Sequence, residues 1–460
     1  MTINFDKPMH VYFVGIGGVS MNGLAQILLS HKYTVSGSDR AKSELTEALE
    51  RNGATVYYDQ SVSHLTGTED LVVFTAAIHK DNPEYIKATE LGLNMVTRAE
   101  FLGELMKNYR VPIGISGTHG KTTTTSMISE ILLAQSLEPT ISNGGILKSI
   151  NSTFNVGKSD YFVFEACEYT NSFLSFFPQI EVILNIEADH LDFFKDLADI
   201  RNSFNRFAKR LPENGTLVIN GDIDNYMEIS SGTDCNIVTF GKGSQNDYYP
   251  DDISFDAMGC PSYTLIRKRD GLKIPVSLGL FGEHNVYNSL AALAVCDILG
   301  IDLGLAASSV SHCTGSKRRF DILGKFNDDV TVIDDYAHHP SEMLATINAA
   351  ANYPHKRLWV VFQPHTYTRT KMLFDDFVNV LSKVDRVILT DVYAAREKDE
   401  YGCNSRTLFE ALRETGCNCE YISSFQDIEV FLHKNCIHGD LLITMGAGNV
   451  VDIANDLVKS

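Results

Sequence analysis

The stretch Gly117-Thr118-His119-Gly120-Lys121-Thr122-Thr123 decides the fold of this chain. It follows an apolar run, residues 111–115, and precedes a helix-like stretch, residues 124–133. Strand, glycine-rich turn, lysine and helix together form a phosphate-binding loop, because glycines let several backbone N–H groups converge on one anion and the helix N-terminus adds its dipole. The lysine supplies a mobile positive charge, and the hydroxyl that follows it ligates Mg²⁺ in such loops.

One position departs from the usual nucleotide-binding pattern. Ile115 stands six residues before Lys121, where that pattern has a glycine. The alternative is an ordinary glycine turn beside a surface lysine. The turn, the lysine, the hydroxyl and the strand–helix context coincide, so we favour the phosphate loop.

Two further apolar strands, expected at residues 160–164 and 180–186, end in acidic clusters. The clusters contain Glu165 and Glu168 after the first strand, and Glu187, Asp189, His190 and Asp192 after the second. Mg²⁺ prefers oxygen ligands and keeps several waters, so one or two protein ligands suffice. By hardness alone, Glu165 ranks above His190 as a ligand. Any single acid is also consistent with a solvated loop residue, but two clusters behind a phosphate loop favour a metal–nucleotide site.

The N-terminal region begins like a dinucleotide fingerprint. A strand at residues 11–14 leads into Gly15-Ile16-Gly17-Gly18, a helix at 21–30 and a strand at 33–37, and Asp39 lies 24 positions after Gly15. Ser20 occupies the place of the third glycine, which makes the signal for NAD weak. We therefore predict a Rossmann-like unit whose turn holds a diphosphate, with Asp39 near a ribose or base. The alternative for Asp39 is a loop carboxylate at a strand end.

The last third of the chain alternates strands with helices. Strands are expected at residues 330–334, 358–362, 386–390 and 441–444, and each delivers polar residues at its end. This alternation predicts a mostly parallel sheet. Before it, Asn285 and Asn288 lie three residues apart, so we expect their amides on one helix face, where they cap the helix or contact a base edge. Arg319 belongs to a basic linker, residues 315–320, and either reaches a phosphate or solubilises that linker.

Composition limits the classes of protein. The 460 residues carry a formal net charge of -19, which disfavours a nucleic-acid binder that needs a basic face. Hydrophobic residues make up 44% and charged residues 21%, as in ordinary globular proteins. The nine cysteines show no zinc-ligand spacing, which favours reduced thiols in the cytoplasm. We expect no signal peptide and no membrane span, because no apolar run approaches ~18 residues.

Taken together, the motifs resemble those of the Mur ligases, the ATP-dependent ligases of peptidoglycan synthesis. The resemblance covers nearly the whole chain, in order. It rests on G-I-G-G (15–18), S-G-S-D (36–39), G-T-H-G-K-T-T-T-T (117–125), E-A-C-E-Y (165–169), N-I-E-A-D-H (185–190), H-N-V-Y-N (284–288), K-R-R-F (317–320), D-D-Y-A-H-H-P (334–340) and Q-P-H-T-Y-T-R-T (363–370). The family's ATP loop lacks the first glycine, which accounts for Ile115.

The resemblance implies roles for individual residues. The ATP-binding set comprises Gly117, Thr118, His119, Gly120, Lys121, Thr122, Thr123, Asn285, Asn288 and Arg319. Lys121 resembles the lysine that contacts the β- and γ-phosphates, and Arg319 the hinge arginine that reaches the γ-phosphate. Thr122 and Glu165 resemble the magnesium ligands, and His190 resembles a histidine at a second Mg²⁺, which overrides the ranking by hardness.

The remaining implied roles concern the other substrates and the chemistry. The UDP-sugar set comprises Gly15, Gly17, Gly18, Asp39, Thr75 and Arg98, and the amino-acid set His365, Arg369 and Tyr336. The catalytic set comprises Lys121, His190, Arg319, Asp335 and His338. One position departs from the family, because Thr366 stands where an arginine is common at the amino-acid site. Arg369 remains to hold a carboxylate, so this departure bears on the choice of amino acid and not on the reaction.

The motifs are most similar to those of the branch that joins L-alanine to UDP-N-acetylmuramate through an acyl phosphate. This implies three α/β domains: a Rossmann-like UDP-sugar domain (1–109), a P-loop ATP domain (110–316) and a Rossmann-like C-terminal domain (317–460). ATP and Mg²⁺ are the expected cofactors, and the partners are small molecules, with the chain a monomer or homodimer in the cytoplasm. Three alternatives stay open: a ligase that recycles peptides onto the same UDP-sugar, an NAD-dependent oxidoreductase, and a non-catalytic nucleotide-binding homologue.

Overall fold

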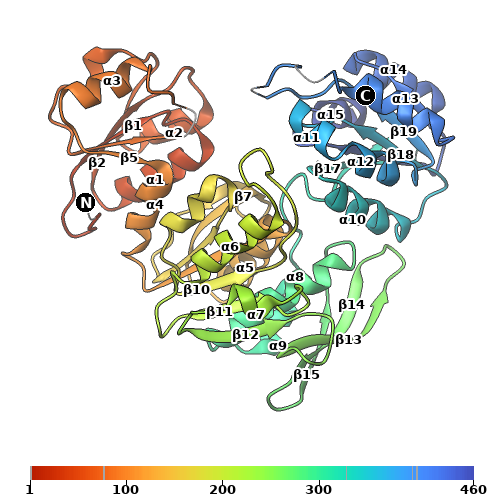
Figure 1. Cartoon of the computed structure of the whole chain (residues 1–460), viewed down its shortest axis with the longest axis horizontal. Coiled ribbons are helices and arrows are strands. Elements are labelled where there is room, and N and C mark those ends of the chain that lie inside the picture. The colour runs from red at the N-terminus through yellow and green to blue at the C-terminus, as the bar shows by residue number, and fades with distance from the viewer. Residues whose placement is uncertain (1–2, 76–77, 328, 396, 400–401, 460) are drawn as a thin grey trace. The chain divides into compact units, whose positions relative to one another are not determined.

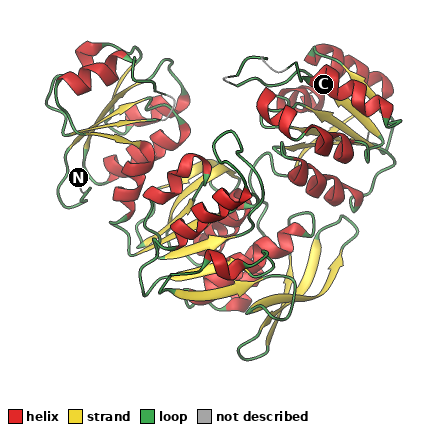
Figure 2. Ribbon diagram, in the orientation of Figure 1, coloured by secondary structure: helices red, strands yellow, loops and turns green. Residues whose placement is uncertain are grey.

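The computed structural model describes residues 3–75, 78–327, 329–395, 397–399 and 402–459. It contains three β-sheets with helices packed against them (Figures 1 and 2). The chain divides into two compact units. The first comprises Met1–Tyr249, Arg267–Gly271 and Ser289–Ser309, and the second comprises Pro250–Ile266, Leu272–Asn288 and Val310–Ser460.

The N-terminal sheet has five parallel strands in the order β3-β2-β1-β4-β5. Its elements are β1 (His10–Val14), α1 (Val19–Ser30), β2 (Thr34–Ser38), α2 (Glu44–Arg51), β3 (Thr55–Tyr57), η1 (Val62–His64), β4 (Leu71–Phe74), α3 (Pro83–Glu90), β5 (Met95–Thr97) and α4 (Arg98–Met106). Strand β1 lies in the middle, between β2 and β4. The glycine turn after β1 therefore lies where the strand order reverses, which is the ligand-binding point of an open parallel sheet.

The middle sheet places the phosphate loop between the two acidic clusters. In the first unit its order is β12-β11-β10-β6-β9-β7-β8. The elements are β6 (Val111–Ser116), α5 (Lys121–Ala134), β7 (Thr140–Leu147), β8 (Ser152–Asn155), β9 (Tyr161–Glu165), η2 (Tyr169–Ser175), β10 (Ile180–Ile183), α6 (Leu197–Ala208), β11 (Thr216–Asn220), α7 (Tyr226–Ile229) and β12 (Asn236–Phe240). Parallel pairing of β6 with both β9 and β10 brings the three strand ends to one edge.

Three more strands and two helices follow. They are β13 (Tyr248–Phe255), β14 (Pro261–Arg267), β15 (Leu272–Ser277), α8 (His284–Ile298) and α9 (Leu303–Ser311). The strands continue the order of the middle sheet beyond β12. Helix α8 contains both Asn285 and Asn288, as their expected place on one helix face requires.

Within the first unit, one apolar core joins the N-terminal and middle sheets. It contains Phe13 and Phe101 together with Phe162 and Phe164. The Tyr109 ring lies 5.0 Å from the ring of Phe162. Helix α4 packs closely on η2, since a Cβ atom added at Gly103 would lie 1.9 Å from the carbonyl oxygen of Ser175.

The C-terminal sheet has six strands in the order β16-β17-β21-β18-β19-β20. Its elements are β16 (Asp321–Phe326), β17 (Val330–Asp335), α10 (Pro340–Ala351), β18 (Leu358–Phe362), α11 (Tyr367–Met372), α12 (Phe374–Leu381), β19 (Arg386–Leu389), α13 (Ser405–Glu414), β20 (Cys419–Tyr421), α14 (Phe425–Asn435), β21 (Leu441–Met445) and α15 (Val451–Lys459). The four predicted strands are β17, β18, β19 and β21. Two more strands, β16 and β20, join them at the edges, and β16 runs antiparallel to β17.

The predicted α/β class with three domains is confirmed. The exact domain boundaries at residues 109 and 316 stay a prediction. Among the described residues, no helix is long and apolar enough to cross a membrane.

Candidate functional site

The phosphate loop has the strand–turn–helix geometry that the sequence predicts. Gly120 caps α5 in the left-handed conformation (φ 84°), so the helix starts at Lys121, three residues earlier than expected. Gly117 has φ 135°, and a Cβ atom there would lie 3.0 Å from Cβ of Leu184. Glycine is therefore needed at both positions, by backbone conformation and by close packing. Lys121, Thr122 and Thr123 occupy the first turn of the helix.

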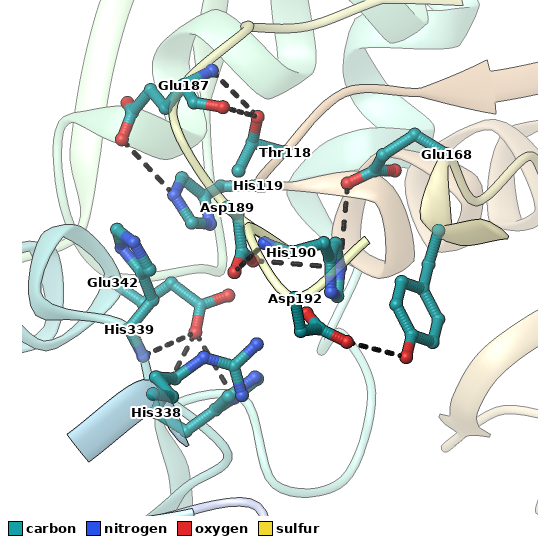
Figure 3. A network of polar contacts seen from close by, with 12 residues as sticks. Thr118, His119, Glu168, Glu187, Asp189, His190, Asp192, His338, His339 and Glu342 are labelled. Atoms are coloured by element: carbon teal, nitrogen blue, oxygen red, sulfur yellow. Dashed lines mark hydrogen bonds and ion pairs between the residues drawn. The ribbon is translucent and has the colours of Figure 1, made fainter. Parts of the chain in front are cut away.

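The segment that follows β10 is hydrogen-bonded to the phosphate loop. The amide of Asn185 accepts a hydrogen bond from the His119 N–H (2.7 Å) and donates one to the His119 carbonyl (3.0 Å). The Glu187 N–H donates to the hydroxyl of Thr118 (2.8 Å). The Glu187 carboxylate also lies 3.3 Å from Nε2 of His119 (Figure 3). Asn185 was absent from the predicted site, although it opens the N-I-E-A-D-H motif.

Lys121 is paired with a buried acid. Its ammonium donates to the carbonyl oxygens of Gly117 and Thr118 and to the Glu168 carboxylate, at 3.1 and 3.3 Å from the two oxygens. The Glu168 side chain is 3% exposed. Burial would lower the pKa of Lys121, but the charge and hydrogen bond of Glu168, together with the nearby Cys167 and Glu165, outweigh burial and hold that pKa above its usual range. The sequence placed Glu168 in an acidic cluster without giving it a role.

His190 lies beside the same acid. Its Nε2 is 3.9 Å from Oε1 of Glu168 and 3.7 Å from the Asp189 carboxylate. The ring of Tyr169 packs on the His190 ring, with 4.5 Å between centroids, and its hydroxyl donates to Asp192 at 2.8 Å. His190 has φ 52°, a left-handed conformation that non-glycine residues adopt rarely and mostly at functional sites.

Two more predicted metal ligands belong to this region. Glu165 ends β9, accepts a hydrogen bond from the Gly144 N–H, and lies close enough to raise the pKa of Lys121. Thr122, 6% exposed, sits in the first turn of α5. A carboxylate, a hydroxyl and an imidazole at one sheet edge suit a divalent cation that keeps part of its water shell.

The N-terminal glycine turn is held by β2 and by Asp39. The N–H groups of Gly15 and Ile16 both donate to the carbonyl of Ser38. The Gly17 N–H donates to Oδ2 of Asp39 at 2.8 Å. A Cβ atom at Gly17 would lie 2.7 Å from that oxygen. Asp39 thus already contacts the backbone that we expect to hold a diphosphate.

The other predicted UDP-sugar residues flank this turn or begin α4. A Cβ atom at Gly15 would lie 3.9 Å from the methyl group of Thr75, and Gly18 caps α1. Arg98 is the first residue of α4, which Thr97 and Glu100 cap reciprocally. Burial lowers the pKa of Arg98, and the Cys167 thiol is near enough to act on it electrostatically.

In the second unit, the two predicted asparagines share one helix face. The Asn288 amide donates to Oδ1 of Asn285 at 2.9 Å, and the Asn285 amide donates to the Phe281 carbonyl at 2.7 Å. Both are 6% exposed. The predicted juxtaposition is therefore present, and Asn285 supports the start of α8.

Arg319 lies in a segment with an unusual backbone conformation, and a hydrogen bond to Asp335 holds that segment. Its neighbours Arg318 (φ 64°) and Phe320 (φ 46°) are both left-handed. The Phe320 N–H donates to Asp335 at 2.8 Å, and the Arg319 guanidinium lies 5.3 Å from the ring centre of Tyr336. Burial raises the pKa of Asp335 to about 6, and the charge of Arg319 opposes that rise.

The predicted amino-acid residues also gather in the second unit. Nδ1 of His338 lies 3.0 Å from the carbonyl of Tyr336, and burial lowers the pKa of His338 to about 4. The ring of His365 is 5.7 Å from that of His338, and Nη1 of Arg369 is 3.4 Å from Nδ1 of His365. Figure 3 shows His338 and His339 near Glu342, whose carboxylate accepts from both backbone N–H groups.

Tyr393 and Thr366 also contact the predicted amino-acid residues. The Tyr393 ring stacks on His365, with 5.7 Å between centroids and 15° between planes. Thr366 has φ 63°, and its hydroxyl accepts from the Arg369 N–H at 3.4 Å, so it caps α11. The sequence did not single out Tyr393, because only the pairing of the segments after β18 and β19 brings it to His365.

Three family models match consecutive stretches that together span most of the chain. The family descriptions "Mur ligase family, catalytic domain", "Mur ligase middle domain" and "Mur ligase, glutamate ligase domain" match residues 10–110, 115–296 and 318–448. The chain belongs to the Mur ligase family. The phosphate loop of this Mur ligase lies in the middle-domain match, and Arg319 lies in the third.

Several relatives of this Mur ligase carry one name. UDP-N-acetylmuramate--L-alanine ligases from Lachnospira eligens and Agathobacter rectalis are 54% and 53% identical to it, over 99% of both chains in each case. A solved UDP-N-acetylmuramate-alanine ligase from Thermotoga maritima is 26% identical with a TM-score of 0.81, covering 98% of both chains. A murein peptide ligase from Psychrobacter arcticus is 25% identical with a TM-score of 0.70 at the same coverage.

Proposed function

We propose that this Mur ligase uses ATP to join L-alanine to the lactoyl carboxylate of UDP-N-acetylmuramate, a step of peptidoglycan precursor synthesis. Full-length similarity to relatives of that name, at 54% identity, carries the proposal. The phosphate loop, with Lys121 in the first turn of α5 beside two acidic strand ends, supports it independently.

The reaction activates a carboxylate. The γ-phosphoryl group of ATP moves to a carboxylate oxygen, which gives an acyl phosphate and ADP. The uncharged amine of L-alanine then attacks the acyl carbon, the amide C–N bond forms, and inorganic phosphate leaves with the electrons of the C–O bond. Two anions must first approach each other, so positive charge from Lys121 and Arg319 is needed around the transferred phosphoryl group.

Two Mg²⁺ ions complete this neutralisation in our proposal. Thr122 and Glu165 would hold one of them, because they offer hard oxygen donors at the carboxyl edge of the middle sheet, and His190 would lie at the second. When bound, they would screen the phosphate charges and polarise the transferred group.

The other substrates have their own candidate residues. The N–H groups of the turn at Gly15–Gly18 would hold the UDP diphosphate, and Asp39 and Thr75 flank that turn. Arg369 would bind the carboxylate of the incoming amino acid, with His365, His338 and Tyr336 around it. His338, neutral at pH 7 because burial lowers its pKa to about 4, offers no positive charge to repel the ammonium form of that substrate.

Protection of the intermediate is a further requirement. Water would destroy an acyl phosphate, so the third domain has to close on the phosphate loop before chemistry.

We also propose a cytoplasmic location, since all nine cysteines are free thiols.

The test is phosphate release from ATP and Mg²⁺ with UDP-N-acetylmuramate, comparing L-alanine, glycine, L-serine and the tripeptide L-alanyl-γ-D-glutamyl-diaminopimelate as amines. Release that depends on both the UDP-sugar and L-alanine supports the proposal. Release with the tripeptide alone would move the chain to the peptide-recycling branch. No release with any amine would favour a non-catalytic homologue. A preference for glycine or L-serine would point to Thr366.

A further inference from the structure

Glu168 is a buried acid for which the reaction above has no role. It follows β9, three residues after Glu165, and its side chain is 3% exposed. A buried carboxylate is unfavourable unless charged or hydrogen-bonding partners surround it. The identity of those partners therefore indicates what the residue does.

The first partner is Lys121. Both carboxylate oxygens accept from its ammonium, at 3.1 and 3.3 Å. The carbonyls of Gly117 and Thr118 accept from the same nitrogen. An ammonium has three donors, so Glu168 and the two loop carbonyls together satisfy it. Lys121 is thus kept inside the loop, where phosphates are expected, and does not extend into solvent.

The second partner is His190. Oε1 of Glu168 lies 3.9 Å from its Nε2, and the next residue, Tyr169, packs its ring on the imidazole at 4.5 Å. Residues 168 and 169 therefore lie against His190 on two sides, the Glu168 carboxylate near Nε2 and the Tyr169 ring on the imidazole, and the Asp189 carboxylate lies 3.7 Å from the same nitrogen. A carboxylate that faces one imidazole nitrogen commonly fixes the ring so that the other nitrogen faces a metal.

We propose that Glu168 is a positioning residue that orients Lys121 and His190 together, and so couples the phosphate-binding charge to the metal ligand. This rests on the proposed function, because it assumes that Lys121 contacts nucleotide phosphates and that His190 contacts the cation. A single buried carboxylate then sets the geometry of two groups from different segments, α5 and the chain after β10.

The test measures nucleotide and metal binding directly. Binding of fluorescent N-methylanthraniloyl-ADP is titrated with and without Mg²⁺ for the parent chain, Glu168→Gln and Glu168→Asp. Glu168→Gln keeps the shape and removes the charge, and we expect the Mg²⁺ concentration for half-maximal binding to rise at least tenfold. Glu168→Asp keeps the charge on a shorter arm, and we expect a smaller rise. Binding of UDP-N-acetylmuramate should change less than twofold.

Glu228→Gln is the matched control. Glu228 pairs with Arg201 at 2.9 Å, is 58% exposed, and lies in the same unit far from the phosphate loop in sequence. It should bind Mg²⁺ and nucleotide like the parent chain. Circular dichroism establishes whether each variant is folded. If Glu168→Gln does not fold, Glu168→Asp still tests the proposal.

Two results would overturn the proposal. One is a Mg²⁺ midpoint for Glu168→Gln within twofold of the parent. The other is tighter Mg²⁺-free binding with an unchanged midpoint, which would make Glu168 only a competitor of the phosphates for Lys121. Because ADP binding needs no ligation, failure of the parent to release phosphate with L-alanine would refute the proposed function without deciding the role of Glu168.

Discussion

Glu181 offers a test of how the middle sheet is stabilised. It lies in β10, paired with Gly114 of β6 and Leu217 of β11, and is 0% exposed. Neither carboxyl oxygen has a hydrogen-bond partner among the described residues. Burial raises the pKa of Glu181 well above its usual range. We therefore expect an uncharged carboxylic acid in the folded chain at neutral pH.

The sign of the pH effect follows from proton binding. In the unfolded chain Glu181 ionises near pH 4.5, its ordinary value, whereas burial in the folded chain raises its pKa and favours the protonated form. Above that pH the folded state binds more protons, so the free energy of unfolding falls as pH rises, by about 1.4 kcal/mol per pH unit until the folded pKa is reached. The unpaired polar group adds a further penalty of roughly 1–3 kcal/mol.

We predict that Glu181→Met, similar in size and apolar, raises the free energy of unfolding at pH 7. The gain over the parent chain should grow as pH rises from 5.5 to 7.5. Glu181→Gln should remove the pH dependence and keep the unpaired polar group. Urea unfolding followed by circular dichroism at several pH values measures both, with hydrogen exchange of the peptide that contains β10 as a local readout. Glu213→Met, at an exposed glutamate before β11, is the control.

A less stable Glu181→Met variant would refute the reasoning. So would an unchanged difference in stability between pH 5.5 and 7.5. Either result would mean that Glu181 is ionised in the folded chain and has a stabilising partner.

Three further predictions concern the substrate sites. Lys121→Ala should abolish ATP turnover and leave UDP-N-acetylmuramate binding within about twofold, as measured by phosphate release and calorimetry; near-normal turnover would contradict the phosphate-loop assignment. Gly17→Ala should weaken UDP-sugar binding at least tenfold while leaving ADP binding unchanged, because its Cβ would meet Asp39 at 2.7 Å; equal affinity in calorimetry would exclude the turn from the site. Asp335→Asn should lower the ligation rate at least tenfold. An amide cannot accept from both the Phe320 and Ala337 N–H groups, and it carries no charge beside Arg319. A ligation rate equal to that of the parent chain would remove Asp335 from the catalytic set.

Local sequence was sufficient to predict the turns and helices that carry the site residues. The turn at Gly117–Gly120 needs two glycines, and the lysine and hydroxyls after it fall in the first helical turn because backbone conformation is set by neighbouring residues. Similarly, the separation of Asn285 and Asn288 was enough to place their amides together, since helical spacing fixes which side chains meet. Element ends were less exact, as α5 begins three residues earlier than predicted.

Partners across the sheet could not be read from the sequence. Asn185 clamps the phosphate loop because β10 pairs with β6, and Glu168 reaches Lys121 because β9 pairs with the other side of β6. Apolar periodicity identifies strands and leaves their order open. The same holds for Tyr393, which meets His365 only through the pairing of two separate segments.

The sequence by itself determined the α/β class, the phosphate loop and the family, because these depend on short motifs and on spacing along the chain. Tertiary structure alone decided that Glu168 lies between Lys121 and His190, that Asp39 contacts the N-terminal turn, and that Glu181 is buried with no hydrogen-bond partner in the described part of the chain. The physical reason is that burial and charge pairing depend on which strands become neighbours. That choice is made by the packing of the whole sheet and not by any one segment.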